Sequence, residues 1–322
     1  MSRPCVFIDG HVGTTGLRIH QWLAGREDLE LAALPQARRK DPAARREALN
    51  QADLAVLCLP DAESRQAVAW IENPATRVID SSTAYRTAPD WVYGLPELEP
   101  GQRSRIAETT RVSNPGCYAT AVILALRPLV DAGILAPDAP LAVHALSGYS
   151  GGGQSLIERW EDPVRGLLAH LYPAPYSLER VHKHIPEIQQ YGGLAHEPQF
   201  IPAVGPFRSG MRVEIPLHSG LLRAGSGAAS PKAIHELLAA RYAGEPFVGV
   251  AEYREPFESD EYAFDPLAHN GTNRLEIVVV PHPSGHALLM VILDNLGKGA
   301  CGVAIQNLNL MLGLTEETGL PT

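Results

Sequence analysis

The sequence predicts two domains, a doubly wound α/β domain followed by an α+β domain, and three observations support this. Short apolar runs alternate with helical patterns over the first 115 residues, as is typical of a parallel sheet with helices on both faces. Beyond residue 117 the β-type runs become longer and include a hairpin pattern. The chain has 322 residues, 45% of them hydrophobic, so it can bury two cores.

The first domain is predicted over residues 1–115, and it opens with a strand at 4–10 and a helix at 15–25. The apolar runs that follow are short and bounded by turn residues, which favours strands over helices. Further strands are expected at 29–34, 52–60 and 76–83, with helices at 41–51 and 61–73 between them.

The second domain is predicted over residues 116–298, around an antiparallel or mixed sheet. Residues 273–296 are predicted to form a hairpin with Pro-Ser-Gly in its loop. Strands at 140–148 and 210–217 and a helix at 230–244 accompany it.

The C-terminal segment 299–322 is predicted to contain a helix that docks back on the first domain. Five apolar residues of the run 300–314 fall on one helical face. They are Ala300, Ala304, Leu308, Met311 and Leu312.

Composition and charge limit the classes of function. The formal net charge is -9 and the Lys and Arg residues do not cluster, so nucleic acid is not an expected partner. No apolar run reaches the length of a membrane span, and the N-terminus has no signal-peptide pattern. None of the four cysteines forms a C-x-x-C pair, which favours a reducing compartment. We therefore expect a cytoplasmic protein.

Three glycines lie between the first strand and the first helix, at Gly10, Gly13 and Gly16. Glycine lets the backbone approach a ligand closely, and the following helix N-terminus offers free N–H groups to a phosphate. Thr14 and Thr15 add hydroxyl donors. The spacing predicts the phosphate-binding turn of a Rossmann-type dinucleotide domain, although a plain strand-to-helix turn remains an alternative.

The identity of the dinucleotide is predicted from the end of the second strand. No acidic residue stands there to hold a ribose diol, whereas Arg38, Arg39 and Lys40 follow it. A cationic cluster suits a 2′-phosphate and so indicates NADP(H), although a basic helix start facing water is the alternative. Pro60 and Ser81 join Gly10 at the carboxyl ends of strands, where such sheets bind ligands.

Cys117 follows Asn-Pro-Gly and begins a long apolar run, so it is predicted to lie in the first turn of a buried helix. The helix dipole and the free N–H groups there favour a thiolate, which is a strong nucleophile toward acyl carbon. Cys5, Cys58 and Cys301 lie in or beside apolar runs and are predicted to be inert.

His182 and His184 are the strongest candidates for an acid/base partner, since imidazole titrates near neutrality. Their close spacing, like that of His282 and His286, also raises the possibility of a metal site. Neither pair has a third ligand at a convincing spacing, so we predict no metal.

Eight sequence blocks occur together, and in the same order, in one known family. They are DGHVGTTG (9–16), DSSTAYR (80–86), VYGLPEL (92–98), SNPGCYAT (113–120), SGYSGGG (147–153), HKHIPEI (182–188), GPFRSGM (205–211) and DNLGKGACGVAIQNLNLM (294–311). Over nearly its full length the chain resembles the shorter type of N-acetyl-gamma-glutamyl-phosphate reductase, in the aspartate-semialdehyde dehydrogenase-like superfamily.

The resemblance implies a reduction of an acyl phosphate to an aldehyde with NADPH, as a step of arginine biosynthesis. It implies Cys117 as the nucleophile that forms a thioester and His184 as the acid/base catalyst. We expect a catalytic and oligomerisation role for the second domain, in a homodimer or homotetramer, because its long strands offer a large subunit interface. The longer type of the family has a histidine where this chain has Ala203, which favours His184 as the base.

Further site residues are predicted with this mechanism. Asn114 is a candidate for stabilising an oxyanion, and Arg86 and Arg208 for holding the substrate carboxylate or phosphate. Ser147 and Gly148, with Asn295, are candidates for the nicotinamide side.

Two other functions remain open from the sequence. A sister acyl-phosphate reductase, such as aspartate-semialdehyde dehydrogenase or an aminoadipyl-phosphate reductase, would share the chemistry. A non-catalytic NADPH sensor would keep the glycine turn but would need no thiol after Asn-Pro-Gly.

Overall fold

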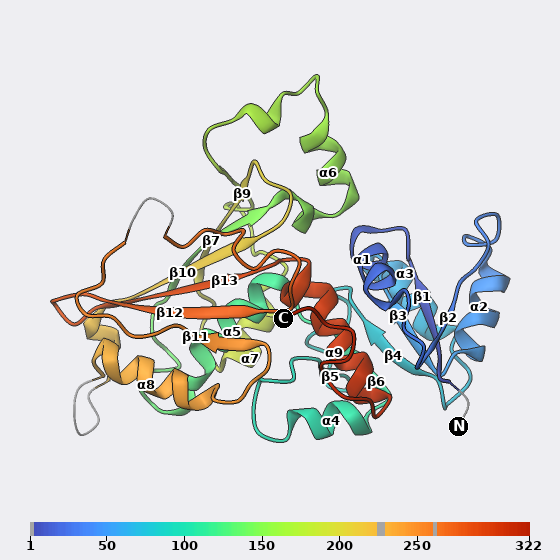
Figure 1. Ribbon diagram of the computed structural model, residues 1–322, viewed down its shortest axis with the longest axis horizontal. Coiled ribbons are helices and arrows are strands. Elements are labelled where there is room, and N and C mark those ends of the chain that lie inside the picture. Colours follow the sequence, from blue (N-terminus) through green and yellow to red (C-terminus); the bar gives the residue numbers. More distant parts are fainter. Residues whose placement is uncertain (1–2, 224–228, 260–262) are drawn as a thin grey trace. The chain divides into compact units, whose positions relative to one another are not determined.

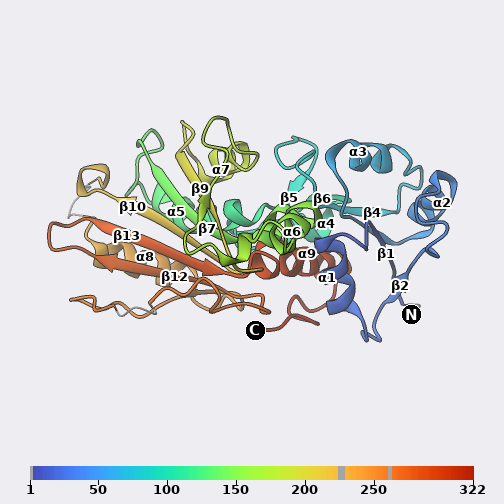
Figure 2. The same ribbon diagram turned by 90° about the horizontal axis from the view of Figure 1, so that it is seen from above.

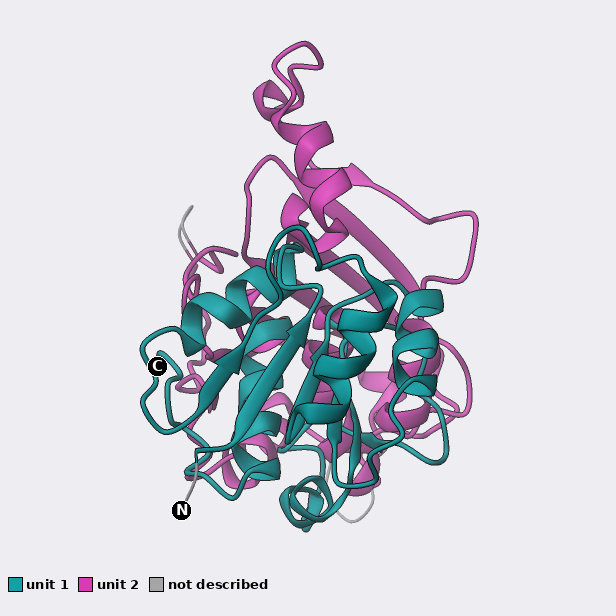
Figure 3. Ribbon diagram, turned by 90° about the vertical axis from the view of Figure 1, so that its right-hand side faces the viewer, with its two compact units in different colours: residues 1–116, 300–321 teal, residues 117–299, 322 magenta. Residues whose placement is uncertain are grey.

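The structure is a computed structural model that describes residues 3–223, 229–259 and 263–322 (Figure 1). The chain divides into two compact units, residues 1–116 with 300–321 and residues 117–299 (Figure 3). Unit 1 contains an all-parallel sheet and unit 2 a mixed sheet, so the predicted fold class is confirmed.

The sheet of unit 1 has six strands in the order β2-β1-β3-β4-β6-β5. The strand order reverses between β1 and β3, and such a switch point places a ligand crevice at the carboxyl ends of the strands. The strands are β1 Cys5–Asp9, β2 Glu30–Ala32, β3 Leu54–Leu57, β4 Arg77–Asp80, β5 Val92–Tyr93 and β6 Arg111–Ser113. The helices between them are α1 Thr14–Leu23, α2 Pro42–Gln51, α3 Asp61–Ala69 and α4 Gln102–Glu108.

Helix boundaries in unit 1 follow local capping chemistry. The Asp41 carboxylate accepts a hydrogen bond from the backbone N–H of Ala43, and Pro42 occupies the first position of α2. Helix α3 ends at Ala69 rather than at residue 73, where the sequence pattern placed its end. Asn73 precedes a proline, which disfavours helical backbone, and its N–H is bound instead by the side chain of Asn50.

Helix α9 (Gly302–Met311) completes unit 1 from the far end of the sequence. It is preceded by a short π-helix, η4 (Gly297–Cys301), a feature that often marks functional regions. All five apolar positions predicted for this segment pack in the core of unit 1 around Ile19 and Val112. Their burial accounts for the return of the chain to this unit.

The other side of α9 is buried as well, although it is polar. Gln306, Asn307 and Asn309 are all fully buried. The Asn307 amide donates to Gly94 O at 2.8 Å and to Asn114 Oδ1 at 3.2 Å. Asn114 in turn donates to the carbonyl of Ala300 at 2.9 Å. These amides therefore join α9 to the Asn-Pro-Gly turn within unit 1.

The sheet of unit 2 has seven strands in the order β11-β12-β13-β10-β7-β9-β8. The predicted hairpin is confirmed, because β12 and β13 pair antiparallel along their whole lengths. Pairs β7–β9 and β11–β12 are parallel, which makes the sheet mixed. The strands are β7 Ala142–Gly148, β8 Ala174–Pro175, β9 Gln199–Gly205, β10 Met211–Leu217, β11 Val248–Val250, β12 Leu275–Pro281 and β13 Ala287–Leu293.

Helices α5 (Cys117–Asp131) and α8 (Pro231–Arg241) pack on strands of this sheet, and α7 (Ile185–Gly192) packs on α5 (Figure 2). Helix α5 is apolar and almost entirely buried, as its sequence predicts. The short helices η1 (Tyr149–Gly152) and η3 (Ser219–Leu221) follow β7 and β10.

Helix α6 (Gln154–Glu161) and the short helix η2 (Leu167–Ala169) form an arm that extends from the sheet of unit 2 (Figure 1). The arm exposes large apolar side chains, including Val164 at 93% and Leu171 at 98%. In the described part of the chain, no helix combines the length and the apolar character needed to cross a bilayer.

We predict that Asn307→Ala lowers the free energy of unfolding by about 1–3 kcal/mol, because Gly94 O and Asn114 Oδ1 lose a buried donor. Urea denaturation of the purified protein would measure the loss. The control is Gln66→Ala at an exposed position of α3, which should change the stability by less than about 0.5 kcal/mol. Equal effects of the two variants would contradict the structural role of Asn307.

Candidate active site

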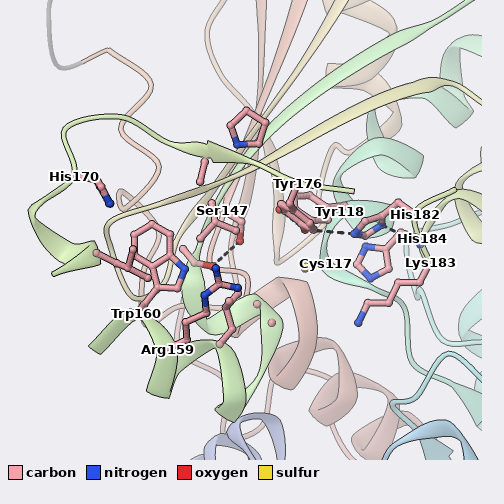
Figure 4. Close-up of a pocket in the computed structure, with 18 of the residues that line it drawn as sticks. Cys117, Tyr118, Ser147, Arg159, Trp160, His170, Tyr176, His182, Lys183 and His184 are labelled. Atoms are coloured by element: carbon pink, nitrogen blue, oxygen red, sulfur yellow. Dashed lines mark hydrogen bonds between the residues drawn. The ribbon is translucent and has the colours of Figure 1, made fainter. Parts of the chain in front are cut away.

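A pocket of about 540 Å³ in unit 2 begins at the first residue of α5 (Figure 4). Cys117, Tyr118, Tyr176 and the histidines of the HKH segment gather at one end of it, and Trp160 and His170 lie at the other. The candidate nucleophile and the candidate base, which are 67 positions apart in sequence, therefore share one cavity.

Cys117 is half-buried and is the first residue of α5. Backbone N–H groups of a first helical turn have no intrahelical acceptor, and the helix dipole favours negative charge near the sulfur. The backbone of Gly299 packs against this residue so closely that a Cβ at position 299 would lie 2.8 Å from the Cys117 Cβ. Only glycine fits there, so the π-helix η4 defines one wall of the nucleophile's position.

His184 immediately precedes α7 and is 4% exposed. Its carbonyl accepts from Ile188 N at 3.0 Å, so the first turn of α7 holds the backbone of this residue. Its ring lies 4.9 Å from that of His182 and 5.6 Å from that of Tyr118, measured between centroids. The imidazole is thus held next to the rings of His182 and Tyr118.

A chain of polar groups connects the two histidines with two tyrosines. The backbone N–H of His184 donates to His182 Nδ1 at 3.2 Å. That acceptor role places the proton of neutral His182 on Nε2, which lies 3.4 Å from the Tyr176 hydroxyl. The Tyr176 hydroxyl lies 3.3 Å from that of Tyr118. The ring of His182 therefore holds the backbone of His184 in place.

The two tyrosines stay protonated near neutral pH. Burial, together with the nearby charge of Cys117, raises the pKa of Tyr176 to about 12. Burial raises the pKa of Tyr118 as well, with Tyr176 and Cys117 adding to the effect. Because the Tyr176 hydroxyl donates to that of Tyr118, the Tyr118 hydroxyl is the one that can donate to a ligand in this pocket. No sequence pattern singled these two residues out.

The remaining cysteines lie in environments that disfavour a thiolate. Burial raises the pKa of Cys58 to about 12. Burial also raises the pKa of Cys5, with the charges of Glu30 and Asp53 contributing. Cys301 is fully buried and its Sγ donates to the carbonyl of Thr15. These positions agree with the inert roles expected for them.

A second pocket, of about 400 Å³, lies in unit 1 at the carboxyl end of β1. Gly10 has φ +88°, and a Cβ there would lie 2.3 Å from Cys58 O, so the turn requires glycine. A Cβ at Gly16 would lie 2.4 Å from Gly10 O. Thr14 Oγ1, at the start of α1, is buried without a hydrogen-bond partner among the described residues. A tight turn, a helix N-terminus and an unused hydroxyl together fit a phosphate-bearing dinucleotide.

Arg39 and Lys40 line this second pocket, whereas Arg38 does not. Arg38 is exposed and faces the Asp41 carboxylate at 3.6 Å. The cationic side of the pocket is thus Arg39 with Lys40 rather than Arg38 with Arg39. The sequence alone could not show which of these three neighbouring cations would face the pocket.

Four other residues predicted to bind the cofactor lie around the same strand ends: Gly13, Thr15, Pro60 and Ser81. Gly13 caps α1, and its N–H donates to Gly10 O at 3.0 Å. Pro60 caps α3, and Ser81 N donates to Leu57 O at 2.9 Å. None of these four residues lines the pocket itself.

The three residues predicted to bind substrate lie outside the pocket of unit 2. Arg86 is buried in unit 1 and donates to the carbonyls of Asn114 and Ser81. Asn114 is 1% exposed and bonded to α9. Arg208 pairs with Glu161 at 2.7 Å on the surface. The cations that do line this pocket, and that the sequence did not reveal, are Arg159, Arg180 and Lys183.

Ser147 and Gly148, at the end of β7, both line the pocket of Cys117. A Cβ at Gly148 would lie 2.5 Å from Arg208 O, which explains the glycine. Asn295 is buried instead, where it accepts from Gly210 N and donates to Ser150. It therefore holds the loop that follows β7.

The histidine pairs considered as metal ligands have other bonds. Nδ1 of His282 accepts from the N–H of Ser284, and Nδ1 of His286 accepts from that of Ser219. Within residues 3–223, 229–259 and 263–322, no three His, Cys, Asp or Glu side chains gather as a metal site.

Comparison with protein families assigns the class of the chain. Residues 35–106 match the family model of the semialdehyde dehydrogenase NAD binding domain, and residues 117–295 match that of the semialdehyde dehydrogenase dimerisation domain. Aspartate semialdehyde dehydrogenase II from Vibrio cholerae has the same fold, with a TM-score of 0.72 at 17% identity over 97% of this chain and 99% of that one. The chain is thus a member of the semialdehyde dehydrogenase class.

Relatives with higher identity define the family within this class. N-acetyl-gamma-glutamyl-phosphate reductase 2 of Pseudomonas putida is 50% identical over 99% of this chain and 100% of the relative. The N-acetyl-gamma-glutamyl-phosphate reductase of Trichormus variabilis is 46% identical over 99% of this chain and 100% of the relative. This chain belongs to the N-acetyl-gamma-glutamyl-phosphate reductase family, as the sequence blocks indicated.

We predict that Gly299→Ala displaces Cys117, because the added Cβ overlaps the Cys117 Cβ. The variant should lose about 1–3 kcal/mol of unfolding free energy. It should also alkylate more slowly at Cys117 with iodoacetamide, as measured by peptide mass spectrometry.

Gly249→Ala on β11 is the matched control, because a Cβ there meets nothing within 4 Å. If both alanine variants keep wild-type stability and alkylation rates, the close packing of Gly299 on Cys117 is not real.

Proposed function

We propose that this protein reduces N-acetyl-gamma-glutamyl phosphate to N-acetyl-glutamate 5-semialdehyde and phosphate with NADPH, a step of arginine biosynthesis. The observation that carries this is the shared pocket of Cys117 and His184, in a chain of the reductase family. A thiol at a helix start beside an imidazole is the arrangement that acyl transfer through a thioester needs.

Cys117 and His184 have different roles in the proposed reaction. The Cys117 thiolate attacks the acyl carbon, the acyl–phosphate bond breaks, and phosphate leaves with the bonding electrons, so a thioester forms on Sγ. His184 supplies a proton to the substrate oxygen as negative charge develops on it, and takes one up in the reverse direction. Tyr118, which accepts a hydrogen bond from Tyr176, is a neutral donor and adds a hydrogen bond at that oxygen.

NADPH, when bound, supplies the hydride. Gly10, Gly16 and the N-terminus of α1 suit its pyrophosphate, and Thr14 offers a buried hydroxyl. Arg39 and Lys40 suit a 2′-phosphate. Gly13, Thr15, Pro60 and Ser81 hold the backbone around this pocket. Ser147 and Gly148 line the catalytic pocket on the side we assign to the nicotinamide.

The substrate carries a carboxylate and a phosphate, so it needs cations. Arg159 and Lys183 line the catalytic pocket, with Arg159 near Trp160 and Lys183 near His184 in Figure 4. We assign the two anionic groups to these two residues. Arg86, Asn114, Asn295 and Arg208 then position the surrounding loops rather than touch the substrate.

The two parts of the chain take separate roles in this proposal. Residues 1–115 with the C-terminal segment 299–322 form the NADP-binding domain, and residues 116–298 form the catalytic and oligomerisation domain. The exposed apolar residues of the α6–η2 arm suit a homodimer or homotetramer. A monomeric mass by light scattering would contradict this assembly.

We place the enzyme in the cytoplasm, and its location in cell fractions would test this.

We expect phosphate-dependent oxidation of N-acetyl-glutamate semialdehyde by the wild-type protein, faster with NADP than with NAD. Aspartate semialdehyde and aminoadipate semialdehyde, assayed side by side, should be poorer substrates. Cys117→Ser should abolish the oxidation and keep NADPH binding. No turnover with the acetylated substrate would overturn the proposed function.

A second variant tests the acid/base role within the same assay. His184→Asn should reduce turnover in both directions by about 10²–10⁴-fold and change the pH–rate profile. His282→Asn, at an exposed histidine outside the pocket, is the matched control and should leave both unchanged. An unaltered profile in His184→Asn would assign the proton transfer to another group.

A further inference from the structure

An acidic side chain lies in the pocket of unit 1 that we assign to the anionic cofactor. Asp9 is the last residue of β1 and directly precedes Gly10 of the glycine turn. Its side chain is 6% exposed and lines the pocket. A buried carboxylate at this place would repel a ligand that carries several phosphate charges.

Arg45 of α2 binds both oxygens of this carboxylate. Its Nε lies 3.2 Å from Oδ1 and 3.1 Å from Oδ2 of Asp9, and its Nη2 lies 2.9 Å from Oδ2. The guanidinium also stacks on the ring of Trp70, at 5.2 Å from the ring centroid. Asp9 and Trp70 therefore fix the orientation of the Arg45 guanidinium. The Nε and Nη2 groups of Arg45 already have the Asp9 carboxylate as their acceptor.

The other charged residues around the pocket are Arg39, Lys40 and Glu63. With Arg45 in place, the charge of Asp9 is balanced, and Arg39 and Lys40 outweigh Glu63. Without Arg45, two carboxylates would oppose two cations. Arg45 thus decides whether the pocket is cationic or neutral overall.

We propose that Arg45 is a positioning residue for the cofactor: it neutralises Asp9 beneath the glycine turn, so that the pocket accepts phosphate and Arg39 and Lys40 are left to bind it. The proposal rests on the proposed use of NADPH. It assigns Arg45 an effect on affinity that depends on Asp9 and involves no contact with the cofactor.

A double-mutant cycle on the full chain tests this, with NADPH affinity measured directly by fluorescence titration. Arg45→Met should raise Kd by about tenfold, since it exposes the cofactor phosphates to an unbalanced charge. Asp9→Asn should bind at least as tightly as wild type. The double variant should return to within about threefold of wild type, and the loss in Arg45→Met should shrink at high salt.

Arg46→Met is the matched control, because Arg46 follows on the same helix and pairs with Glu72 at the exposed surface. It should leave Kd unchanged. If Arg45→Met does not fold, as judged by circular dichroism, Arg45→Lys replaces it. This variant keeps the charge, so it should bind within about threefold of wild type, and a larger loss would contradict the proposal.

Two outcomes separate this inference from the proposed function. A wild-type protein that does not bind NADPH would overturn both. A wild type that binds NADPH, with a double variant as weak as Arg45→Met alone, would overturn only the charge-balancing role of Arg45.

Discussion

The packing of Gly299 on Cys117 is the contact on which the position of the candidate nucleophile depends. The chain leaves unit 1 after Gly116 and returns to it at Ala300, so residues far apart in sequence meet at the start of α5. In unit 1, the Asn114 amide holds the carbonyl of Ala300 next to the Asn-Pro-Gly turn. The candidate nucleophile is therefore fixed by the return of the chain as much as by its own helix.

A second set of constraints surrounds the imidazole. The N-terminus of α7 fixes the backbone of His184, and His182 accepts the N–H of that same residue. The polar contacts then continue from His182 through Tyr176 to Tyr118, the residue that follows Cys117 in the sequence. Networks of this kind hold orientation more firmly than single hydrogen bonds do, because each member fixes the tautomer or rotamer of the next.

The helices and strands that could be predicted from the sequence are those whose buried residues follow a simple hydrophobic pattern. Strand β3 in the middle of the unit 1 sheet is apolar throughout, and Cys117 lies at the junction of a turn and an apolar helix. Side-chain destinations were not predictable in this way. Arg86 lies in one of the eight sequence blocks but forms its hydrogen bonds within unit 1. Arg159 lines the pocket from the α6–η2 arm, where no sequence motif indicated this role. The buried Asn307 could not be foreseen either, because its partners come from other segments.

The π-helix η4 has a consequence for the evolution of this family. A π-helical turn holds one residue more than an α-helical turn. Loss of one residue between positions 297 and 301 would leave a regular helix, but would move each residue of α9 to its neighbour's position, about 100° around the helix axis. The asparagines would then face the apolar core and the leucines the polar turn. Length variation should therefore be common in the surface loops of homologues and absent from this short segment.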